Sequence, residues 1–317
     1  MTKLIHVAVG VIVNTDGKIL IAKRPQTAHQ GGLWEFPGGK VDAGETIERA
    51  LARELSEELA IDVIESRPLI QIRHHYPDKS VLLDVHKVTH FKGEPIGNEG
   101  QPVQWVAADS LKDFQFPEAN RPIISAINLP EKYLITGKYN DLPDFAARLE
   151  RALSRSVPVL QLRVAQFAFE SHQAFLDVAI AAIKKTDTQL VINCCCDEFV
   201  RIKAVYPEVP IGLHLNQLNI RNLAERPLDA QTLFGVSCHN ADEILHAQKL
   251  GADYILLSPV LPTSTHPDVE PLGWNRFSAL VELANIPVYA LGGLDESHIS
   301  QAQLCGAQGI AGISFGW

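Results

Sequence analysis

The sequence predicts an α/β protein of two domains, a mixed α/β unit followed by a (β/α)8 barrel of parallel strands. The first observation behind this is length, because 317 residues exceed the usual size of one domain. The second is a change of rhythm near residue 131, after which strand-like runs alternate regularly with helical segments. With 46% hydrophobic and 21% charged residues, both parts are expected to be ordered. We place the domains at residues 1–130 and 131–317.

The first domain is expected to contain five strands and two helices. The strand-like runs are IHVAVGVIVN (5–14), KILIAKR (18–24), LIQIRHHY (69–76), VLLDVHKVTHF (81–91) and QPVQWVA (101–107). Between the second and third runs, apolar residues recur at intervals of four and define the buried face of a helix, at Ile47, Leu51, Leu55 and Leu59. RPIISAI (121–127) predicts a second helix, and Pro130 interrupts the pattern after it.

The second domain is expected to contain eight parallel strands. Their runs are KYLITG (132–137), VPVLQLRV (157–164), QLVINC (189–194), PIGLHL (210–215), LFGVSCH (233–239), YILLSPV (254–260), IPVYALGG (286–293) and GIAGIS (309–314). Eight strands separated by helical segments predict a closed barrel. The sequence stops soon after the eighth run, so we expect the last covering helix to be missing. The linker, the first domain or a second subunit of a homo-oligomer would then cover that side.

Charge and composition narrow the classes of partner. A net charge of −9 argues against binding along a nucleic-acid lattice, and favours small phosphorylated ligands held by a metal ion or by backbone amides. No signal-peptide pattern is visible and no apolar run reaches about 18 residues, so a cytoplasmic protein without membrane contact is expected. The consecutive Cys194, Cys195 and Cys196 would alternate in direction on a strand, which predicts structural thiols rather than one metal site.

The acidic helix of the first domain raises an electrostatic question. Glu54, Glu57 and Glu58 repeat at spacings of three and four residues, where like charges repel each other. A bound Mg²⁺ or Mn²⁺ ion prefers hard oxygen ligands, and would neutralise this face, bring a polyphosphate to it and activate water for attack on phosphorus. The alternative is an acidic helix face that is simply solvated.

The order of residues around this helix favours a metal site. It resembles the Nudix box, and the matching residues are Gly39, Glu45, Arg53, Glu54, Leu55, Ser56, Glu57 and Glu58. The resemblance implies a Nudix α/β/α sandwich in which the metal is held by Glu54, Glu57, Glu58 and the backbone of Gly39. It also implies that Glu45 and Arg53 orient the loop and the helix. Ala60 stands where the family has glycine, which puts the C-terminal turn of the helix in question.

Across the first domain the resemblance is closest to MutT-type hydrolases, which remove oxidised guanine nucleotides. It rests on VAVGVI, AKRPQTAHQGGLWEFPGGK, GEPIGNEGQPVQW and FPEANRPII. It implies Mg²⁺-dependent cleavage of the nucleoside triphosphate 8-oxo-dGTP, with Glu99 as metal ligand or base and Arg24 as a substrate contact. Asn120 would read the 8-oxopurine, because an amide pairs with both N7–H and O6, whereas guanine presents N7 only as an acceptor. The alternative for Asn120 is a turn or helix-cap residue.

The barrel carries a second resemblance, at the carboxyl ends of its strands. Active sites of such barrels lie there, and phosphate commonly binds after strands seven and eight. Here those ends carry residues whose backbone amides could approach an anion closely, with tight turns as the alternative: Gly292, Gly293, Gly312, Ile313 and Ser314. With QLR, GVSCHN, GADYILLSPVLPTSTHP and ALGGL, they resemble thiamine-phosphate synthase and thiazole tautomerase.

This second resemblance implies a thiamine-related phosphate as ligand, contacted by Gln161, Arg163, Ser237 and His239. His239 would act as a proton shuttle in a tautomerisation, and a buried, satisfied histidine is the competing interpretation. Departures from the synthase pattern occur where synthases carry two lysines and two aspartates, at Ala165, Cys194, Asn219 and His266. Without those charges Mg²⁺ and pyrophosphate are held weakly, so the usual synthase turnover is not expected.

Three functions are therefore weighed for the chain. The first is an 8-oxo-dGTP hydrolase whose barrel binds a phosphorylated ligand. The second is a hydrolase of a thiamine-related pyrophosphate, joined to a barrel with tautomerase or synthase activity. The third is a nucleotide-sensing protein without turnover. The simultaneous presence of Glu54, Glu57, Glu58 and Glu99 favours an enzyme, because a sensor need not retain all four.

Overall fold

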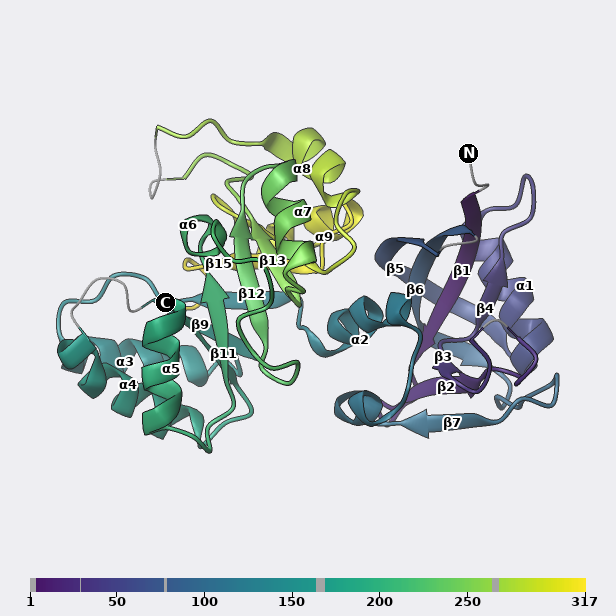
Figure 1. The fold of residues 1–317 in the computed structure, drawn as a ribbon, viewed down its shortest axis with the longest axis horizontal. Helices are drawn as coiled ribbons and strands as arrows, with labels where there is room; N and C mark the ends of the chain where they lie inside the picture. Colours follow the sequence, from purple (N-terminus) through teal and green to yellow (C-terminus); the bar gives the residue numbers. More distant parts are fainter. Residues whose placement is uncertain (1–3, 29, 77–78, 164–168, 264–267) are drawn as a thin grey trace. The chain divides into compact units, whose positions relative to one another are not determined.

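The computed structural model describes residues 4–28, 30–76, 79–163, 169–263 and 268–317 (Figure 1). The chain divides into two compact units, Met1–Leu129 and Pro130–Trp317. Among the described residues, no helix combines the length and the apolar character that crossing a membrane would require.

The first unit contains two β-sheets. The larger has the strand order β4 (Gly38–Lys40), β1 (Leu4–Ile12), β6 (Ser80–Lys92) and β5 (Asp62–His75). In it β1 and β6 are parallel, and the other neighbouring strands are antiparallel. The smaller sheet is antiparallel and has the order β3 (Trp34–Glu35), β2 (Ile19–Lys23) and β7 (Val103–Val106).

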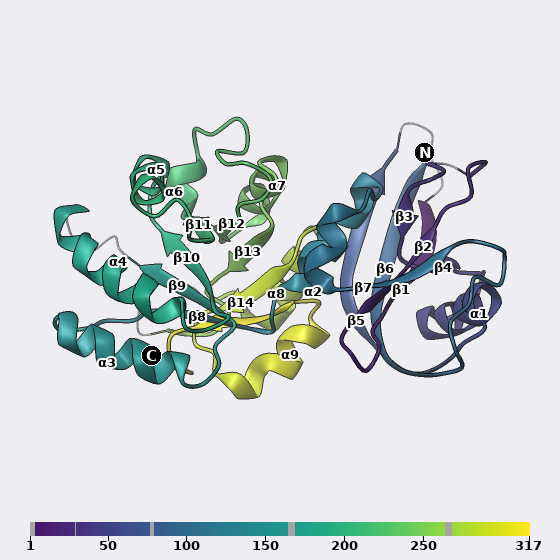
Figure 2. The same ribbon diagram turned by 90° about the horizontal axis from the view of Figure 1, so that it is seen from below.

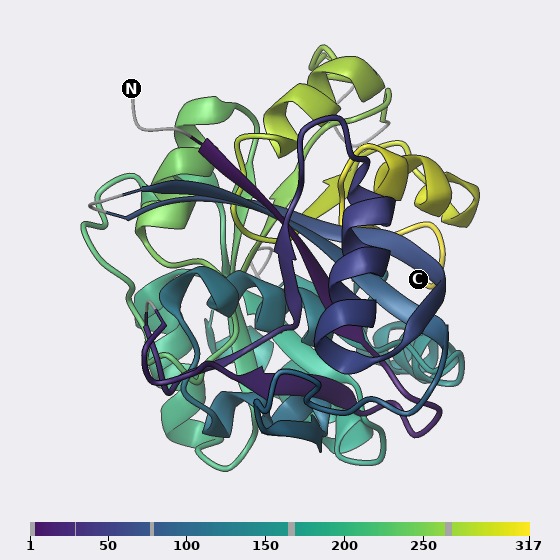
Figure 3. The same cartoon turned by 90° about the vertical axis from the view of Figure 1, so that its right-hand side faces the viewer.

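Helices cover both faces of the larger sheet, as the α/β/α expectation requires. Successive side chains of a strand point to opposite faces, and β1 follows this rule. Ala8 and Ile12 pack in one cluster with α1 (Ile47–Leu59), which lies over the strands in Figure 3. Val9 and Val11 pack in another cluster with η1 (Ala108–Asp113) and α2 (Arg121–Asn128).

Helix α1 has a defined cap at each end. The Thr46 side chain accepts a hydrogen bond from a first-turn amide. The predicted apolar row is fully buried at Leu51, Leu55 and Leu59. At the other end Ala60 adopts the left-handed conformation, with φ 56° and ψ 36°, and its N–H bonds to carbonyl groups of the last turn. The turn expected to favour glycine therefore forms around alanine, at a conformational cost of about 1–2 kcal/mol.

Two parts of the first unit differ from the sequence-based expectation. Strand β5 begins at Asp62, before the predicted start at Leu69, and includes Pro68. It is an edge strand with irregular register near Pro68, where a missing N–H is tolerated. The short strands β3 and β4 were not predicted, because their segment is rich in glycine and their pairing depends on partners elsewhere in the chain, as in Ala8 with Gly39.

The second unit is a closed barrel of eight parallel strands, which confirms the prediction. The strands, in order around the barrel, are β8 (Lys132–Ile135), β9 (Val159–Arg163), β10 (Gln189–Asn193), β11 (Ile211–Leu215), β12 (Phe234–Cys238), β13 (Tyr254–Leu257), β14 (Val288–Leu291) and β15 (Gly309–Gly312). The connecting helices are α3 (Leu142–Leu153), α4 (Phe169–Ile183), α5 (Cys196–Val205), α6 (Gln217–Ile220), α7 (Ala241–Lys249), α8 (Gly273–Val281), η3 (Glu296–His298) and α9 (Ile299–Leu304). Figure 2 shows α3 and α4 side by side.

The barrel interior is aromatic and polar rather than purely aliphatic. Tyr133, Tyr254 and Tyr289 are fully buried, with ring centroids 5.3 to 5.9 Å apart. Gly235 on β12 makes room for one of these rings, since a Cβ there would lie 2.1 Å from Tyr254 Cζ. Buried phenols need hydrogen-bond partners, so the interior must also contain polar groups.

Residues 313–317, after β15, form a bend and a turn. The Trp317 ring packs against Phe145 and Tyr139, with centroid distances of 5.6 and 6.4 Å. Its indole N–H donates to the carbonyl oxygen of Lys138 at 3.3 Å. This turn therefore covers the start of α3 and the loop before it.

Candidate functional site

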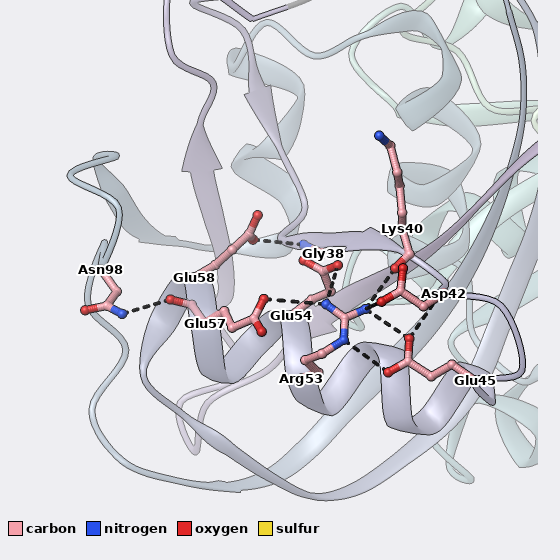
Figure 4. A network of polar contacts seen from close by, with 9 residues as sticks. All are labelled: Gly38, Lys40, Asp42, Glu45, Arg53, Glu54, Glu57, Glu58 and Asn98. Atoms are coloured by element: carbon pink, nitrogen blue, oxygen red, sulfur yellow. Dashed lines mark hydrogen bonds and ion pairs between the residues drawn. The ribbon is translucent and has the colours of Figure 1, made fainter.

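Arg53 joins the carboxylates of the acidic helix to the loop before it (Figure 4). Its Nε and Nη2 donate to the two oxygens of Glu45 at 3.1 and 3.0 Å, a bidentate pair. Nη2 also donates to the carbonyl oxygen of Lys40 at 3.0 Å. Nη1 donates to Glu54 at 2.8 Å and to Glu57 at 3.5 Å. One guanidinium thus holds β4, the following loop and α1 together.

The pKa values around Arg53 follow from these contacts. The hydrogen bond from Arg53 lowers the pKa of Glu45, and the amide of Asp42 lowers it further. The same carboxylate bonds raise the pKa of the Arg53 guanidinium above its usual value. The Glu45–Arg53 pair is therefore charged at every ordinary pH, as a loop-orienting pair requires.

Glu58 lies nearer the C-terminal end of α1 and points toward Gly38 of β4 (Figure 4). Its Oε2 accepts a hydrogen bond from the Gly38 amide at 3.1 Å. Burial raises the pKa of Glu58 to about 7; the Gly38 bond opposes this, while the nearby carboxylates of Glu35, Glu99 and Glu54 add to it. Negative charge from β3, α1 and the loop before β7 therefore gathers around one half-buried carboxyl.

Gly39 brings the backbone of β4 against the helix. A Cβ at this position would lie 2.1 Å from Glu54 Oε2, so any larger residue would force the Glu54 carboxylate to move from its present position. The backbone and carboxylate oxygens of this region form the hard donor set that Mg²⁺ and Mn²⁺ prefer. In the described part of the chain, however, no three His, Cys, Asp or Glu side chains are already arranged to hold a metal ion. Glu54 and Glu57 are held by Arg53 instead, and would have to turn from it to bind one.

The loop that carries Glu99 is fastened to the C-terminal end of α1. Asn98 Nδ2 donates to the Glu57 carbonyl oxygen at 2.8 Å, and Gln101 Nε2 donates to the Glu58 carbonyl oxygen at 2.9 Å. The Glu99 backbone N–H donates to Gln101 Oε1 at 2.9 Å. The Glu99 carboxylate is exposed, and its charge contributes to the raised pKa of Glu58. Sequence reasoning missed both amide side chains, and their one signal was that they flank Glu99 in NEGQ.

Arg24, directly after β2, pairs with Glu35 of β3. Burial raises the pKa of Glu35, and the positive charge of Arg24 opposes that shift. Because the Glu35 charge also acts on Glu58, Arg24 is connected to the acidic cluster through one intermediate carboxylate. Sequence reasoning identified Arg24 but missed Glu35.

Asn120 is buried, with 8% of its surface exposed, and stands at the start of α2. Its backbone N–H donates to the Pro117 carbonyl oxygen at 2.9 Å, but its side chain makes no capping hydrogen bond to the helix. Asn120 thus occupies the turn and N-cap position that the alternative interpretation predicted, but its side chain does not act as the cap. The segment before it packs on β3, where Trp34 donates to Gln115 at 2.8 Å and contacts Phe114 edge to face.

A cavity of about 1060 Å³ lies at the carboxyl ends of the barrel strands. Eight sequence-predicted residues line it: Arg163, Ser237, His239, Gly292, Gly293, Gly312, Ile313 and Ser314. Gly292 and Gly293 have φ of 102° and 69°, and a Cβ at Gly293 would lie 2.4 Å from the Pro262 carbonyl oxygen. The hydroxyl of Ser314 donates to the Leu294 carbonyl oxygen at 3.0 Å and joins the loops after β14 and β15.

Gln161 does not line this cavity, although sequence reasoning placed it there. It is fully buried in the barrel interior, and its Nε2 donates to the Tyr133 hydroxyl at 3.0 Å. Lining residues that sequence reasoning missed include Asn193, Asn216, Gln217, Ser258 and Asp295. Asn193 and Ser258 lie in the last residues of predicted strand runs, and the other three follow such a run within two residues. This position at the carboxyl end of a strand was the signal that could have found them.

Of the four positions that depart from the synthase pattern, the structure describes two. Cys194 is buried and Asn219 is half-buried on α6, and neither lines the cavity in the part of it that the structure describes. Ala165 and His266 lie outside the described residues. Charged side chains among the described lining residues are Arg163 and Asp295. Burial lowers the pKa of Arg163, and its Nε has no hydrogen-bond partner among the described residues.

His239 has a defined tautomer. Its Nδ1 lies 2.7 Å from the carbonyl oxygen of Ser258. A carbonyl oxygen only accepts, so Nδ1 carries the hydrogen, and in the neutral ring Nε2 is then an acceptor. The side chain is exposed, which contradicts the interpretation of His239 as a buried, satisfied histidine.

Comparisons with known proteins give two separate similarities. Residues 132–315 match the family model for thiamine monophosphate synthase, and residues 8–126 match that for a NUDIX domain. The chain is 38% identical over 125 residues to 8-oxo-dGTP diphosphatase of Escherichia coli, over 39% of this chain and 97% of that protein. It is 35% identical over 124 residues to CTP pyrophosphohydrolase of Escherichia coli, over 39% of this chain and 91% of that protein. It is 32% identical over 188 residues to the "Putative thiamine-phosphate synthase 2" of Aquifex aeolicus, over 59% of this chain and 98% of that protein.

Proposed function

We propose a function from one premise: the chain belongs to the Nudix hydrolases over residues 8–126 and to the thiamine monophosphate synthase family over residues 132–315. We infer that the first unit cleaves 8-oxo-dGTP to 8-oxo-dGMP and pyrophosphate, and so cleans the nucleotide pool. The observation that carries this is the gathering of Glu35, Glu54 and Glu99 around Glu58, beside a backbone that glycine at position 39 lets approach.

Nudix hydrolases generally need a divalent metal ion, and we propose Mg²⁺ here, with Mn²⁺ as a substitute. Glu54, Glu57, Glu58, Glu99 and the backbone of Gly39 would hold it. A bound ion of this kind supplies neutralising charge and a water activated for attack on phosphorus. The Arg53–Glu45 pair keeps the loop and α1 in register with each other while substrate enters.

Base selection is assigned to Asn120, with Arg24 as a second substrate contact. A buried amide that does not cap its helix keeps its donors and its acceptor for a base edge. The Glu35 carboxylate holds Arg24 in place from the side of the acidic cluster. Relatives of the first unit bear the names of both an oxidised-purine and a pyrimidine triphosphate hydrolase, so the substrate must be tested directly.

A substrate panel tests this proposal. The full chain would be incubated with Mg²⁺ and 8-oxo-dGTP, 8-oxo-GTP, dGTP, CTP or thiamine diphosphate, and kcat/KM and the released phosphates measured. We expect the highest kcat/KM for an 8-oxoguanine nucleotide, release of pyrophosphate, and loss of turnover when EDTA removes the metal. A higher value for thiamine diphosphate would favour the thiamine-related hydrolase, and binding without turnover would favour a nucleotide sensor.

For the barrel we propose binding of a phosphate monoester without the usual synthase turnover. The cavity has Arg163 and the glycine-lined loops after β14 and β15 for the phosphate. Neutral residues at positions 194 and 219 give no charge to hold Mg²⁺ and a pyrophosphate. The test is incubation of the chain with thiazole phosphate, hydroxymethylpyrimidine diphosphate and Mg²⁺. Thiamine phosphate formed at about 0.1 s⁻¹ or faster would refute the proposal.

A tautomerase is the second candidate for the barrel, favoured by His239. Its exposed ring has Nδ1 fixed as a donor to Ser258, so Nε2 is the base in the neutral form. A tautomerisation needs such a proton shuttle and no metal ion. Proton exchange at a thiazole phosphate ligand, followed by NMR in D₂O, would show this activity, and a His239→Ala variant should abolish it.

A further inference from the structure

A continuous chain of hydrogen-bonded side chains crosses the interior of the barrel and joins two residues of the cavity wall. Its links, in order, are Asn193 Nδ2 to Gln161 Oε1 (3.4 Å), Gln161 Nε2 to Tyr133 OH (3.0 Å), Tyr133 OH to Tyr254 OH (2.7 Å), Tyr254 OH to His214 Nδ1 (3.4 Å) and His214 Nε2 to Ser237 Oγ (2.8 Å). The four middle residues are fully buried, whereas Asn193 and Ser237 line the cavity. We call this set the interior chain.

The direction of the hydrogens along the interior chain follows from the Gln161 amide. Its nitrogen can only donate, so the Tyr133 oxygen accepts from it. The Tyr133 hydroxyl then donates to Tyr254, and the Tyr254 hydroxyl donates to Nδ1 of His214. The His214 ring must therefore carry its hydrogen on Nε2 and donate it to Ser237. The hydroxyl hydrogen of Ser237, a residue of the cavity wall, is then not used within the interior chain.

If the Gln161 amide keeps its orientation and the hydrogen bonds from Tyr133 to Ser237 are reversed, one buried hydroxyl is left without an acceptor. The Tyr133 oxygen would then accept from both Gln161 and Tyr254, and its own hydrogen would meet no acceptor among the described residues. An unpaired buried polar group costs about 1–3 kcal/mol. The first direction gives both buried tyrosine hydroxyls an acceptor.

The charge state of His214 agrees with this direction. Burial lowers the pKa of His214 to about 3, and the positive charge of Arg163 lowers it as well. The ring is therefore neutral at ordinary pH, as a ring that accepts at Nδ1 and donates at Nε2 must be. Its neutral state also avoids a second buried charge beside Arg163.

We propose that the interior chain makes Ser237 a hydrogen-bond donor to the barrel ligand, with Gln161, Tyr133, Tyr254 and His214 as positioning residues. The inference rests on the proposed phosphate-binding function of the barrel. A ligand seated there presents a hydrogen-bond acceptor, such as a carbonyl oxygen, to Ser237. The exposed apolar side chains of Leu218 and Val269 line the same cavity and suit a ring between that acceptor and the phosphate group.

The first test needs no variant and no ligand. In ¹⁵N NMR spectra of the histidine rings of the full chain at pH 7, we expect His214 to be protonated at Nε2 and His239 at Nδ1. Protonation of His214 at Nδ1 would mean that the Gln161 amide is reversed and that Ser237 donates to His214 instead. That result would overturn the proposal.

The second test compares two ligands of one shape. They are 2-(4-acetylphenyl)ethyl phosphate and 2-(4-isopropenylphenyl)ethyl phosphate, in which a CH₂ group replaces the carbonyl oxygen. By calorimetry we expect the acetyl compound to bind about 3- to 10-fold more tightly, the scale of one hydrogen bond. Ser237→Ala should bring the ratio near one, and Tyr254→Phe, which frees His214 Nδ1, should lower it and shift the His214 signals.

Tyr289→Phe is the matched control. Tyr289 is a third fully buried tyrosine whose ring contacts Tyr133 and Tyr254, but its hydroxyl donates to the Pro130 carbonyl oxygen at 2.6 Å, outside the interior chain. The ratio should stay at the wild-type value in this variant. Equal binding of both ligands to the wild type would overturn the inference and leave phosphate binding intact. Binding of neither ligand would refute phosphate binding, and with it the ligand contact of Ser237.

Discussion

The acidic helix of the first unit and the cavity of the barrel arrange their polar groups in opposite ways. On the helix, like charges gather at a half-exposed surface: the side chain of Glu54 is 16% exposed and that of Glu57 is 59% exposed, and Arg53 bridges them. In the barrel, neutral side chains pair with one another in a fully buried interior. In our proposal the first arrangement is completed by a bound cation, whereas the second contains only neutral groups that pair with one another.

Burial acts in the same sense at both places, because it favours the neutral form of each group. It raises the pKa of Glu58 to about 7 and lowers the pKa of His214 to about 3. For the carboxyl, a metal ion that binds must first displace the proton of the neutral form. For the imidazole, only the neutral ring can accept a hydrogen bond at Nδ1 and donate one at Nε2.

The largest expected effect is the loss of hydrolysis in Glu57→Gln. The variant keeps the shape of the side chain but removes a charge from the proposed metal site, and we expect kcat with Mg²⁺ to fall by about 100-fold or more. Glu48→Gln, on the first turn of the same helix, should stay within about twofold of the wild type. Ligand binding by the barrel should be the same in both variants. Undiminished hydrolysis in Glu57→Gln would refute the metal assignment.

The next effect concerns base selection. Asn120→Ala should reduce the preference for 8-oxo-dGTP over dGTP by about 1–3 kcal/mol, because a desolvated hydrogen-bonding edge loses its partner. The measurement is the ratio of kcat/KM for the two substrates in wild type and variant. Asn128→Ala is a control on the same helix, since Asn128 bonds to backbone carbonyls of its own helix and of η1. If the ratio is the same in Asn120→Ala as in wild type, another residue recognises the base.

The two units should also respond to pH with opposite slopes. The folded pKa of His214 lies below its unfolded value, so the barrel loses stability as pH falls below about 6.5, by about 2 kcal/mol at pH 5. The folded pKa of Glu58 lies above its unfolded value, so the metal-free first unit loses stability as pH rises from about 4.5 to about 7. Hydrogen exchange of peptides from β11 and α1 at several pH values measures both slopes.

Variants and Mg²⁺ separate these contributions. His214→Gln should flatten the acid slope of β11, and Glu58→Gln should flatten the slope of α1. Added Mg²⁺ should stabilise α1 most at high pH, because a ligating carboxyl must first lose its proton. Parallel slopes in the two units would contradict the contrast drawn here between them.

The smallest effect is expected at the end of α1. Ala60→Gly should stabilise this helix by about 0.5–1 kcal/mol, because glycine adopts the left-handed conformation without strain. Ala52→Gly, in the interior of the same helix, should destabilise it by about 1 kcal/mol. Hydrogen exchange of α1 measures both, and hydrolysis should be unchanged in Ala60→Gly. Destabilisation by both glycines would show that Ala60 is not strained.

Local pattern was enough for much of the fold and for the acidic helix. The eight barrel strands and the buried row of α1 were predicted because alternation and helical spacing are properties of neighbouring residues. Pattern failed where a partner far along the chain decides the structure. Strand β4 exists because it pairs with β1, and β5 extends past Pro68 because it is an edge strand.

The sequence by itself determined which residues carry charge at the first site, since the spacing of Glu54, Glu57 and Glu58 places them together on any helix. Only the tertiary structure decided what meets them: Glu35 from β3, and Glu99 on a loop fastened by Asn98. The same holds in the barrel, where five contributing strands bring Gln161, Tyr133, Tyr254, His214 and Ser237 into one interior chain. The periodicity of a strand predicts which of its side chains point into the barrel. Which of them meet there depends on how the barrel closes, and the direction of each hydrogen bond depends on the partner that is met.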